Sequence, residues 1–371
     1  MLRIAPWGGS ENLWFKTAIS ALDHGHSVLI IVHHKLSNHT NIQLLVQKGA
    51  SLFILQDFLE NYLDRIINKI NPKHFLNLSL KSFNECLRIF QPNIILVNQP
   101  GCFDIVFTPF AQRFLQSTSY PFSICSHSYL EENILGNGDK SLLNKIFEKA
   151  QTCYFVAEVQ CKAILLQIGA KPRKIVYVSN PLNGTVQHLK YPINQGKVKF
   201  ATIGSLDVNW KGQDTIIEIL ATSKWLEKPW ELYIYGAGSD LDCLKNLIKS
   251  RGLESRVFLK GFESDLQTIW SDKDILLMPS KVDAAPSVLL EAMGCGRTCV
   301  STNIGFVSEW IVDKQNGFLS KSALIEDFEN ALELAWDRKQ DWEKMGLKCC
   351  KIYEDRALKN PEEDFLGKIL N

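Results

Sequence analysis

The sequence predicts an α/β protein made of two doubly wound, Rossmann-like domains. Its 371 residues suffice for two domains that each bury a core of their own. Short apolar segments alternate with amphipathic ones along the chain, which is typical of parallel sheets covered by helices on both faces. Charge divides the chain too, because residues 1–185 hold 17 Lys and Arg against 12 Asp and Glu, whereas residues 186–371 hold 24 against 28.

A linker is expected between residues 183 and 199, where Gly184, Pro192 and Gly196 interrupt any helical periodicity. We therefore expect an N-terminal domain over residues 1–185 and a C-terminal domain over residues 186–350. Residues 351–371 are expected to form a C-terminal helix that returns to the N-terminal domain.

In the N-terminal half, residues 10–24 predict an amphipathic helix, and three buried strands are expected at residues 27–32, 94–97 and 122–125. The first helix should follow a strand, yet only the residues before Pro6 are left to form it. Either that strand is stunted or the chain has lost a few N-terminal residues.

In the C-terminal half, strands and helices alternate. Strands are expected at residues 199–203, 231–235, 257–259, 275–278 and 298–301, and helices at residues 212–222, 240–250, 265–271, 286–293 and 325–338. Ligands of such sheets bind beyond the carboxyl ends of the strands, so the loops after strands are where functional residues are expected.

Composition excludes several classes of protein. The formal net charge of +1 argues against a nucleic-acid binder. No apolar run approaches the roughly 20 residues of a membrane-spanning helix, and the N-terminus does not resemble a secretion signal. The 10 cysteines are scattered without a Cys-x-x-Cys pair, which favours buried free thiols in a reducing compartment over zinc ligands or disulfides. A cytoplasmic protein is expected.

The loop around Gly8 and Gly9 opens the first helix. Adjacent glycines let backbone N–H groups approach a ligand, and a helix N-terminus favours an anion. A tight turn with Ser10 as the N-cap is an equally good interpretation of this loop.

Lys211 and Gly212 follow a predicted strand and stand at the start of the next helix. A lysine at this place can neutralise a diphosphate together with the positive helix terminus. The alternative is a solvated lysine at a helix start.

Residues 279–296 carry the most information. A loop of small residues follows a strand and contains Asp283, and the helix after it carries Glu291 among apolar residues. A carboxylate on a buried helix face is costly unless it is hydrogen-bonded, and ribose hydroxyls would meet that need. Pairing with local backbone or with Arg297 is the alternative.

These segments together resemble the family-four glycosyltransferases, retaining enzymes of GT-B fold that use nucleotide-sugar donors. The resemblance spans nearly the whole chain and is strongest over residues 199–320. It is carried, in the expected order, by Gly8-Gly9-Ser10-Glu11 and residues 22–28, by residues 175–183, by Lys211-Gly212, Tyr235-Gly236-Ala237-Gly238 and Leu259-Lys260-Gly261-Phe262, and by residues 279–296.

The resemblance implies two Rossmann-like domains that face a central cleft. It implies transfer of a hexosyl or related sugar, without a metal, from a nucleotide-diphosphate sugar to an acceptor hydroxyl in glycan, polysaccharide or glycolipid synthesis. The nucleotide sugar is a co-substrate, and no other cofactor is implied. Lys211 and the helix termini would supply the positive charge that a metal supplies elsewhere.

The resemblance also assigns roles to residues. Asp283, Lys211 and His127 are the expected catalytic residues, with Asp283 against the donor sugar, Lys211 on the phosphates and His127 near the acceptor. Glu291 would hold the ribose and Phe262 the base. The remaining donor-binding residues implied are Gly8, Gly9, Ser205, Gly236, Ala284, Ala285, Ser287 and Val288, the last three through backbone N–H groups near the phosphate or sugar.

Two positions depart from the family pattern. Ser205 stands where the family has Arg, and Asp283 stands where it usually has Glu. A non-catalytic or weakly active sugar-nucleotide binder is therefore the alternative. A dinucleotide-dependent oxidoreductase is disfavoured, because Leu241 replaces the third glycine after Gly236 and Gly238.

The acceptor class stays open among glycans, lipid-linked intermediates and small molecules. The N-terminal half has a net charge of +5 and holds Trp7, Trp14 and Phe15 near its start. It could therefore rest on the anionic inner face of a membrane. A solvated basic surface over core aromatics is the alternative interpretation. No nucleic-acid partner is expected.

Overall fold

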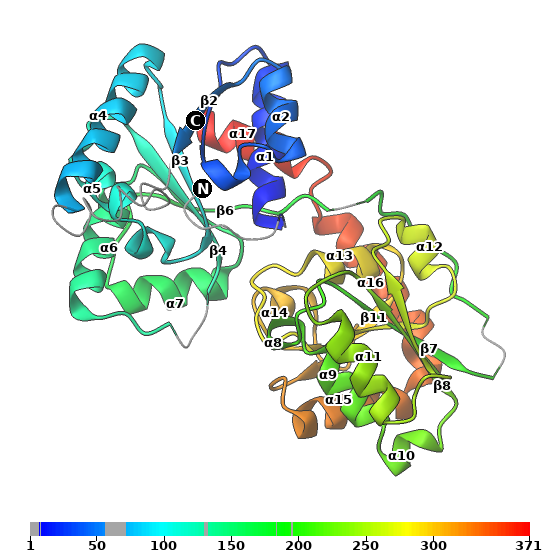
Figure 1. Cartoon of the computed structure of the whole chain (residues 1–371). Coiled ribbons are helices and arrows are strands. Elements are labelled where there is room, and N and C mark those ends of the chain that lie inside the picture. Colours follow the sequence, from blue (N-terminus) through cyan, green and yellow to red (C-terminus); the bar gives the residue numbers. More distant parts are fainter. Residues whose placement is uncertain (1–6, 8, 56–71, 130–132, 183, 194–195) are drawn as a thin grey trace. The chain divides into compact units, whose positions relative to one another are not determined.

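The structure is a computed structural model (Figure 1), and it describes residues 7, 9–55, 72–129, 133–182, 184–193 and 196–371. It divides into two compact units. Unit 1 comprises Met1–Pro181 with Leu358–Asn371, and unit 2 comprises Leu182–Ala357. The division expected at residue 351 falls inside a helix of unit 2, α16 (Trp342–Arg356), and the chain returns to unit 1 only at Leu358.

Unit 1 contains two parallel sheets. One pairs β1 (Leu29–His33) with β2 (Ser51–Leu55), and Ile30 faces Leu52 in the register. The other has the order β3-β4-β5-β6. Its strands are β3 (Ile95–Gly101), β4 (Phe122–Ser128), β5 (Cys153–Phe155) and β6 (Ile175–Tyr177). A strand expected before the first helix would lie outside the described residues.

Seven α-helices are described in unit 1. They are α1 (Gly9–Asp23), α2 (Thr40–Gln47), α4 (Pro72–Phe90), α5 (Pro109–Ser117), α6 (Asn137–Lys149), α7 (Glu158–Ile168) and α17 (Pro361–Leu370), with two short 3-10 helices at His34–Leu36 and Asp104–Phe107. Although α17 (red) comes from the far end of the chain, it packs beside α1 (blue) in Figure 1. The fully buried ring of Phe365 meets Tyr154 of β5 edge-on at 5.0 Å, and the Tyr154 hydroxyl donates to the Lys368 carbonyl at 2.8 Å.

Unit 2 contains one parallel sheet of six strands in the order β12-β11-β10-β7-β8-β9. The strands are β7 (Val198–Ile203), β8 (Trp230–Tyr235), β9 (Val257–Gly261), β10 (Ile275–Met278), β11 (Thr298–Thr302) and β12 (Phe318–Ser320). Every residue of β10 and β11 is buried, as a strand covered on both faces requires. The direction in which strands are added reverses between β7 and β10, and this reversal defines a doubly wound sheet.

The helices of unit 2 connect these strands. They are α8 (Val208–Lys211), α9 (Gln213–Leu220), α10 (Ser223–Leu226), α11 (Leu241–Ser250), α12 (Leu266–Trp270), α13 (Ser287–Gly294), α14 (Val307–Trp310), α15 (Ile325–Asp337) and α16, with a 3-10 helix at Lys339–Asp341. Ile216, Leu232 and Leu332, all without exposed surface, belong to the core that these helices form with the sheet.

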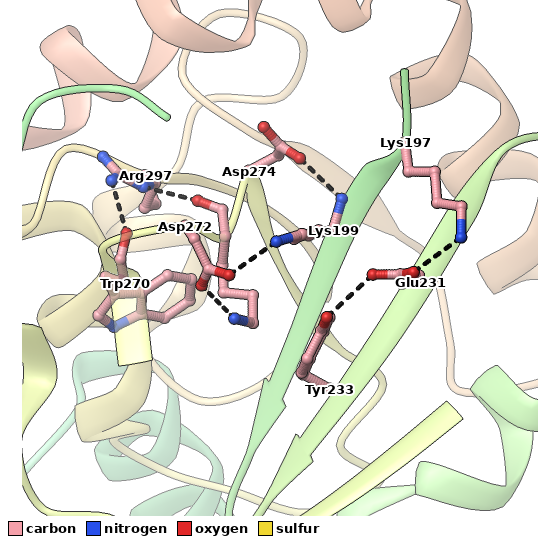
Figure 2. A network of polar contacts seen from close by, with 9 residues as sticks. Lys197, Lys199, Glu231, Tyr233, Trp270, Asp272, Asp274 and Arg297 are labelled. Carbon is pink, nitrogen blue, oxygen red and sulfur yellow. Dashed lines mark hydrogen bonds and ion pairs between the residues drawn. The ribbon is translucent and has the colours of Figure 1, made fainter. Parts of the chain in front are cut away.

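A polar network ties the amino ends of the central strands to their neighbours (Figure 2). The backbone N–H of Lys199 donates to the Asp274 carboxylate at 2.7 Å, and its ammonium binds Asp272 at 2.8 Å. Arg297, which has no exposed surface, donates to the backbone carbonyls of Lys273 and Trp270 at 2.8 and 2.7 Å. The fully buried Arg297 thus has partners for its charge, as a buried charge requires.

All ten cysteines are free thiols, eight of them buried, as the composition predicted. Burial raises the pKa of the Cys299 thiol to about 12, so this thiol stays protonated. In the part of the chain that the structure describes, no helix is long and apolar enough to cross a membrane.

Candidate functional site

Two of the expected catalytic residues meet at the carboxyl edge of the unit 2 sheet. Lys211 follows β7 and Asp283 follows β10, and these two strands are neighbours. The order of strands reverses between them, and this is where open α/β sheets bind ligands.

Lys211 ends the single turn of α8, and α9 begins only at Gln213. Gly212, between the two helices, has a left-handed backbone with φ of 67°, and this conformation interrupts the helix. A side chain at Gly212 would also overlap the Pro279 carbonyl oxygen, so the loops after β7 and β10 touch here. Lys211 therefore precedes the helix start instead of lying in its first turn, and it is held against the loop that carries Asp283.

The ammonium of Lys211 donates to Asp283 Oδ2 at 2.5 Å. The side chains are 24% and 18% exposed, so the ion pair is shielded but reachable from solvent. The second oxygen of Asp283 accepts the backbone N–H of Ala285 at 3.3 Å. An anion that bound Lys211 would therefore have to share this lysine with Asp283.

Glu291 lies on α13 and is 3% exposed. On α16, burial raises the pKa of the Tyr353 phenol, and electrostatic interactions with Cys295 and Glu291 raise it further. Arg297, a candidate partner from the sequence, donates to backbone carbonyls as described above.

The start of α13 faces the same loop. Pro286 is the N-cap, so Ser287 and Val288 are the first residues of this helix, where backbone N–H groups have no carbonyl one turn earlier to bind. Ala284 is buried, and its carbonyl accepts the N–H of Phe306 at 2.9 Å. This hydrogen bond connects the loop from Asp283 to Pro286 with the segment that follows β11.

Ser205, Gly236 and Phe262 lie further along the same edge. The Ser205 carbonyl accepts the side-chain amide of Gln213 at 2.8 Å, and its hydroxyl offers no positive charge where the family has Arg. Gly236 has a φ of 141°, and a side chain there would overlap the Gly204 carbonyl oxygen. Phe262 is 78% exposed and follows β9, two strands from β7, so it is about 10 Å or more from Lys211 along the sheet edge.

A second group of polar residues lies in unit 1. His127 Nε2 is 2.7 Å from Asn98 Oδ1 and 3.3 Å from Cys125 Sγ. Burial lowers the pKa of His127 to about 4, against an opposing hydrogen bond from Asn180. The ring is therefore neutral at neutral pH, and Nε2–H donates to Asn98.

Gly9 belongs to this second group. A side chain added at Gly9 would lie 3.5 Å from the Asn180 amide nitrogen, and Asn98 donates to the Ser10 carbonyl at 3.5 Å. The first turn of α1 thus touches the surroundings of His127. Gly8 lies outside the described residues.

Sequence reasoning missed Asn98 and Asn180. A polar residue directly after the apolar run at residues 94–97 was the available signal for Asn98. Asn180 stands within the recognised segment 175–183, which could have drawn attention to it.

The three aromatic residues considered for membrane contact pack together instead. Trp7 lies 5.7 Å from Trp14, 5.6 Å from Phe15 and 4.2 Å from the ring of His39, on which it stacks. All three are only partly exposed and pack on the small core beside β1. This packing favours the interpretation of these residues as core aromatics over their interpretation as exposed membrane anchors.

Within the described residues, no group of three or more His, Cys, Asp and Glu side chains is arranged to hold a metal ion. Metal independence stays a prediction from the resemblance.

Solved structures share the architecture of this chain. HepE from Anabaena, in complex with UDP and glucose, matches 99% of this chain and 96% of its own, with a TM-score of 0.70 and 17% identity. The apo form of the lipopolysaccharide outer core galactosyltransferase WaaB matches 99% of this chain and 97% of its own, with a TM-score of 0.71 and 18% identity. The fold is therefore the GT-B fold of glycosyltransferases, as the resemblance implied.

Sequence comparison agrees with this fold: residues 185–348 match the family model of the glycosyl transferases group 1. An uncharacterized glycosyltransferase of Haemophilus influenzae is 25% identical over 63% of this chain and 66% of its own length. The poly(ribitol-phosphate) alpha-N-acetylglucosaminyltransferase of Staphylococcus aureus is 28% identical over 72% of this chain and 53% of its own length. The lipopolysaccharide 1,6-galactosyltransferase of Salmonella typhimurium is 24% identical over 69% of this chain and 67% of its own length. The matched regions thus span about half to two thirds of these relatives.

Proposed function

We propose that this chain is a retaining glycosyltransferase that moves a sugar from a uridine diphosphate sugar to a hydroxyl group of a glycan or lipid-linked acceptor. The observation that carries the proposal is the Lys211–Asp283 pair at the reversal between β7 and β10. Uridine is favoured because the matched HepE structures hold UDP, UDP with glucose, and UDP-glucose. The acceptor class is favoured by the names of the relatives that act on ribitol phosphate polymer and lipopolysaccharide.

Unit 2 would bind the donor. Lys211 and the first N–H groups of α13, at Ser287 and Val288, would neutralise the diphosphate, Glu291 would accept hydrogen bonds from the ribose hydroxyls, and Phe262 would lie on the base. This positive charge comes from the protein, so the proposed reaction uses no metal.

The reaction would keep the configuration of the sugar. The bond between the anomeric carbon and the diphosphate oxygen breaks as the acceptor oxygen bonds to the same carbon from the same face. The departing phosphate oxygen takes the acceptor proton. His127, being neutral with a pKa of about 4, would orient the acceptor by hydrogen bonding and would not act as a cation.

Ser205 and Asp283 favour a second candidate, a protein that binds sugar nucleotides without transferring the sugar. One cationic partner of the leaving diphosphate is replaced by a hydroxyl, and such a loss costs about 2.7–4 kcal/mol of transition-state stabilisation. The two candidates share the binding site and differ in turnover.

A thermal-shift screen against UDP-glucose, UDP-galactose and UDP-N-acetylglucosamine tests binding. Donor at a hundred times its dissociation constant stabilises by about 2.7 kcal/mol. The donor that binds is then assayed for hydrolysis and for transfer, with the anomeric configuration of the product read by NMR. Inversion would refute the retaining mechanism, and binding without hydrolysis or transfer would favour the second candidate.

We further propose a cytoplasmic location with peripheral contact at the inner membrane face. With the aromatic residues packed in the core, this contact now rests on the positive charge of the N-terminal half alone. Binding to anionic vesicles that weakens as salt rises would support it. Equal binding to neutral vesicles would contradict it.

A further inference from the structure

Unit 2 contains a polar cavity of about 290 Å³ beside β8 and β9. Tyr233 and Tyr235 of β8 line it, together with Thr268 of α12 and residues that follow this helix. Leu232 and Ile234 belong to the core on the other face of β8, because successive residues of a strand point to opposite faces. The volume corresponds to roughly ten water molecules, so the cavity has room for a small polar ligand.

The hydroxyl group of Tyr235 is an unused hydrogen-bond donor in this cavity. The side chain is 4% exposed, and within the described part of the chain no group forms a hydrogen bond with its hydroxyl. Burial raises the pKa of this phenol to about 12, and the charges of Asp272 and Glu263 raise it further, so the hydroxyl keeps its proton. Buried polar groups ordinarily have partners, and an oxygen of a ligand in the cavity would be the acceptor that this hydroxyl lacks.

Lys260 lines the cavity from an irregular place in the sheet. Ile234 faces Leu259 and Tyr235 faces Gly261, so Lys260 is the extra residue of a bulge between β8 and β9. A bulge changes the direction of a side chain, and bulges are frequent beside functional sites. Among the described residues, none forms an ion pair with the Lys260 ammonium, which is therefore available to a ligand.

Lys273 adds a buried positive charge to the lining. Its side chain is 3% exposed, and its ammonium lies 3.9 Å from the centre of the Tyr233 ring. The ammonium binds Asp272, but the Asp272 carboxylate also binds Lys199 at 2.8 Å (Figure 2). Burial lowers the pKa of Lys273, and the charges of Lys199 and Lys260 lower it further, against the opposing effect of Asp272. An anion in the cavity would balance this excess of positive charge.

We propose that the cavity binds a phosphate group, either inorganic or carried by a small sugar. The Tyr235 and Ser271 hydroxyls and the Lys260 ammonium would donate to its oxygens, and Lys273 would add positive charge. A phosphate has enough oxygens to accept from all of these donors. Binding of a neutral sugar by stacking is disfavoured, because Lys273 already lies over the face of the Tyr233 ring.

This site is separate from the proposed donor site, because neither Lys211 nor Asp283 lines the cavity. Phosphate binding here therefore goes beyond sugar transfer and can be tested without an assay of activity. Glu263 is the lining carboxylate that opposes an anion, and one of its oxygens accepts the backbone N–H of Asp265 at 2.8 Å. Its opposing charge gives the site a signature that a site for a cation would not show.

The first experiment locates the bound phosphate. Backbone amide NMR of the full chain, titrated with inorganic phosphate at constant ionic strength, should show shifts at Tyr235, Gly261 and Ser271 with one dissociation constant. Lys260→Gln should raise this constant about tenfold, because it removes a charged donor. Lys249→Gln, at an exposed lysine of α11 outside the cavity, changes the net charge equally and should leave the constant unchanged.

Equal dissociation constants in the two lysine variants would overturn the proposal. Shifts confined to the loops after β7 and β10 would overturn it too, because they would place the phosphate at the proposed donor site. Loss of UDP binding or of sugar transfer would contradict the proposed function and would leave phosphate binding in this cavity unaffected.

The second experiment tests the sign of the charge and the source of the phosphate. Glu263→Gln should tighten phosphate binding about threefold by removing a nearby negative charge, and Tyr235→Phe should weaken it about fivefold. Weaker binding by Glu263→Gln would overturn the proposal. Glucose 6-phosphate that binds the same amides more tightly than inorganic phosphate supports a sugar phosphate as the ligand, and equal affinity supports inorganic phosphate. Glucose alone, if it bound as tightly as glucose 6-phosphate, would overturn the assignment to phosphate.

Discussion

Replacing Asp283 with Asn should tighten the binding of UDP. In the structure, the Lys211 ammonium donates a hydrogen bond to Asp283 Oδ2 at 2.5 Å. The proposed diphosphate would bind the same ammonium and would compete with Asp283 for it. Asparagine removes the negative charge and keeps the size of the side chain, so it frees Lys211 without opening a cavity.

The geometry sets the magnitude. A phosphate oxygen bound to Lys211 at about 2.8 Å can lie no farther than about 5 Å from Asp283 Oδ2. Two unit charges at about 5 Å repel by about 1 kcal/mol in water and about 3 kcal/mol at the effective dielectric constant of a protein surface. Because the pair is partly exposed, we expect the lower part of this range, a roughly tenfold fall in the dissociation constant.

Isothermal titration calorimetry with UDP measures this change. Asp242→Asn is the matched control, because its carboxylate is 86% exposed and binds Lys245 on α11, so it changes net charge equally. Equal or weaker UDP binding by Asp283→Asn than by the wild type, with the control unchanged, would refute the proposed sharing of Lys211. Sugar transfer by the variant should fall even as UDP binding improves, since the carboxylate proposed to face the sugar is gone.

Other predictions concern stability. Because the His127 pKa of about 4 lies below its unfolded value near 6.5, the protein should lose up to about 3 kcal/mol of unfolding free energy as pH falls from 6.5 to 4. His127→Gln should remove this part of the slope in urea titrations, and an unchanged slope would contradict the assignment. Gly236→Ala should lower the free energy of unfolding by about 3 kcal/mol, because φ is positive at this residue and the new methyl group would overlap the Gly204 carbonyl. Thermal unfolding measures this loss, and a loss below about 1 kcal/mol would argue against this tight turn. Phe365→Ala should destabilise by about 3–5 kcal/mol, since its ring is fully buried against Tyr154; a loss typical of a surface residue would mean that α17 contributes little to unit 1.

The sequence predicted eight of the twelve described strands and missed β2, β5, β6 and β12. Strands such as Ile275–Met278 were found because central parallel strands are continuously apolar. β5, β6 and β12 have three residues each, too few for any period to show. Ser51–Leu55 was missed as well, although it is apolar and follows a turn at Gly49.

The candidate site was predicted as separate motifs. The sequence placed Lys211 and Asp283 after strands, but their contact depends on β7 and β10 being neighbours, which no local pattern encodes. The sequence analysis also missed the helix α8 before Gly212, because its four residues are too few for a helical period to show.

The return of α17 to unit 1 has a consequence for synthesis on the ribosome. The chain enters unit 2 at Leu182 and leaves it at Ala357, so unit 2 is inserted between two parts of unit 1. Domains fold as units while the chain emerges. Unit 2 can therefore complete its fold before Phe365 reaches Tyr154, although most of unit 1 is made first. Until α17 emerges, the apolar surface that it covers on α1 and β5 stays exposed, and during this time the nascent protein is open to chaperones and to aggregation.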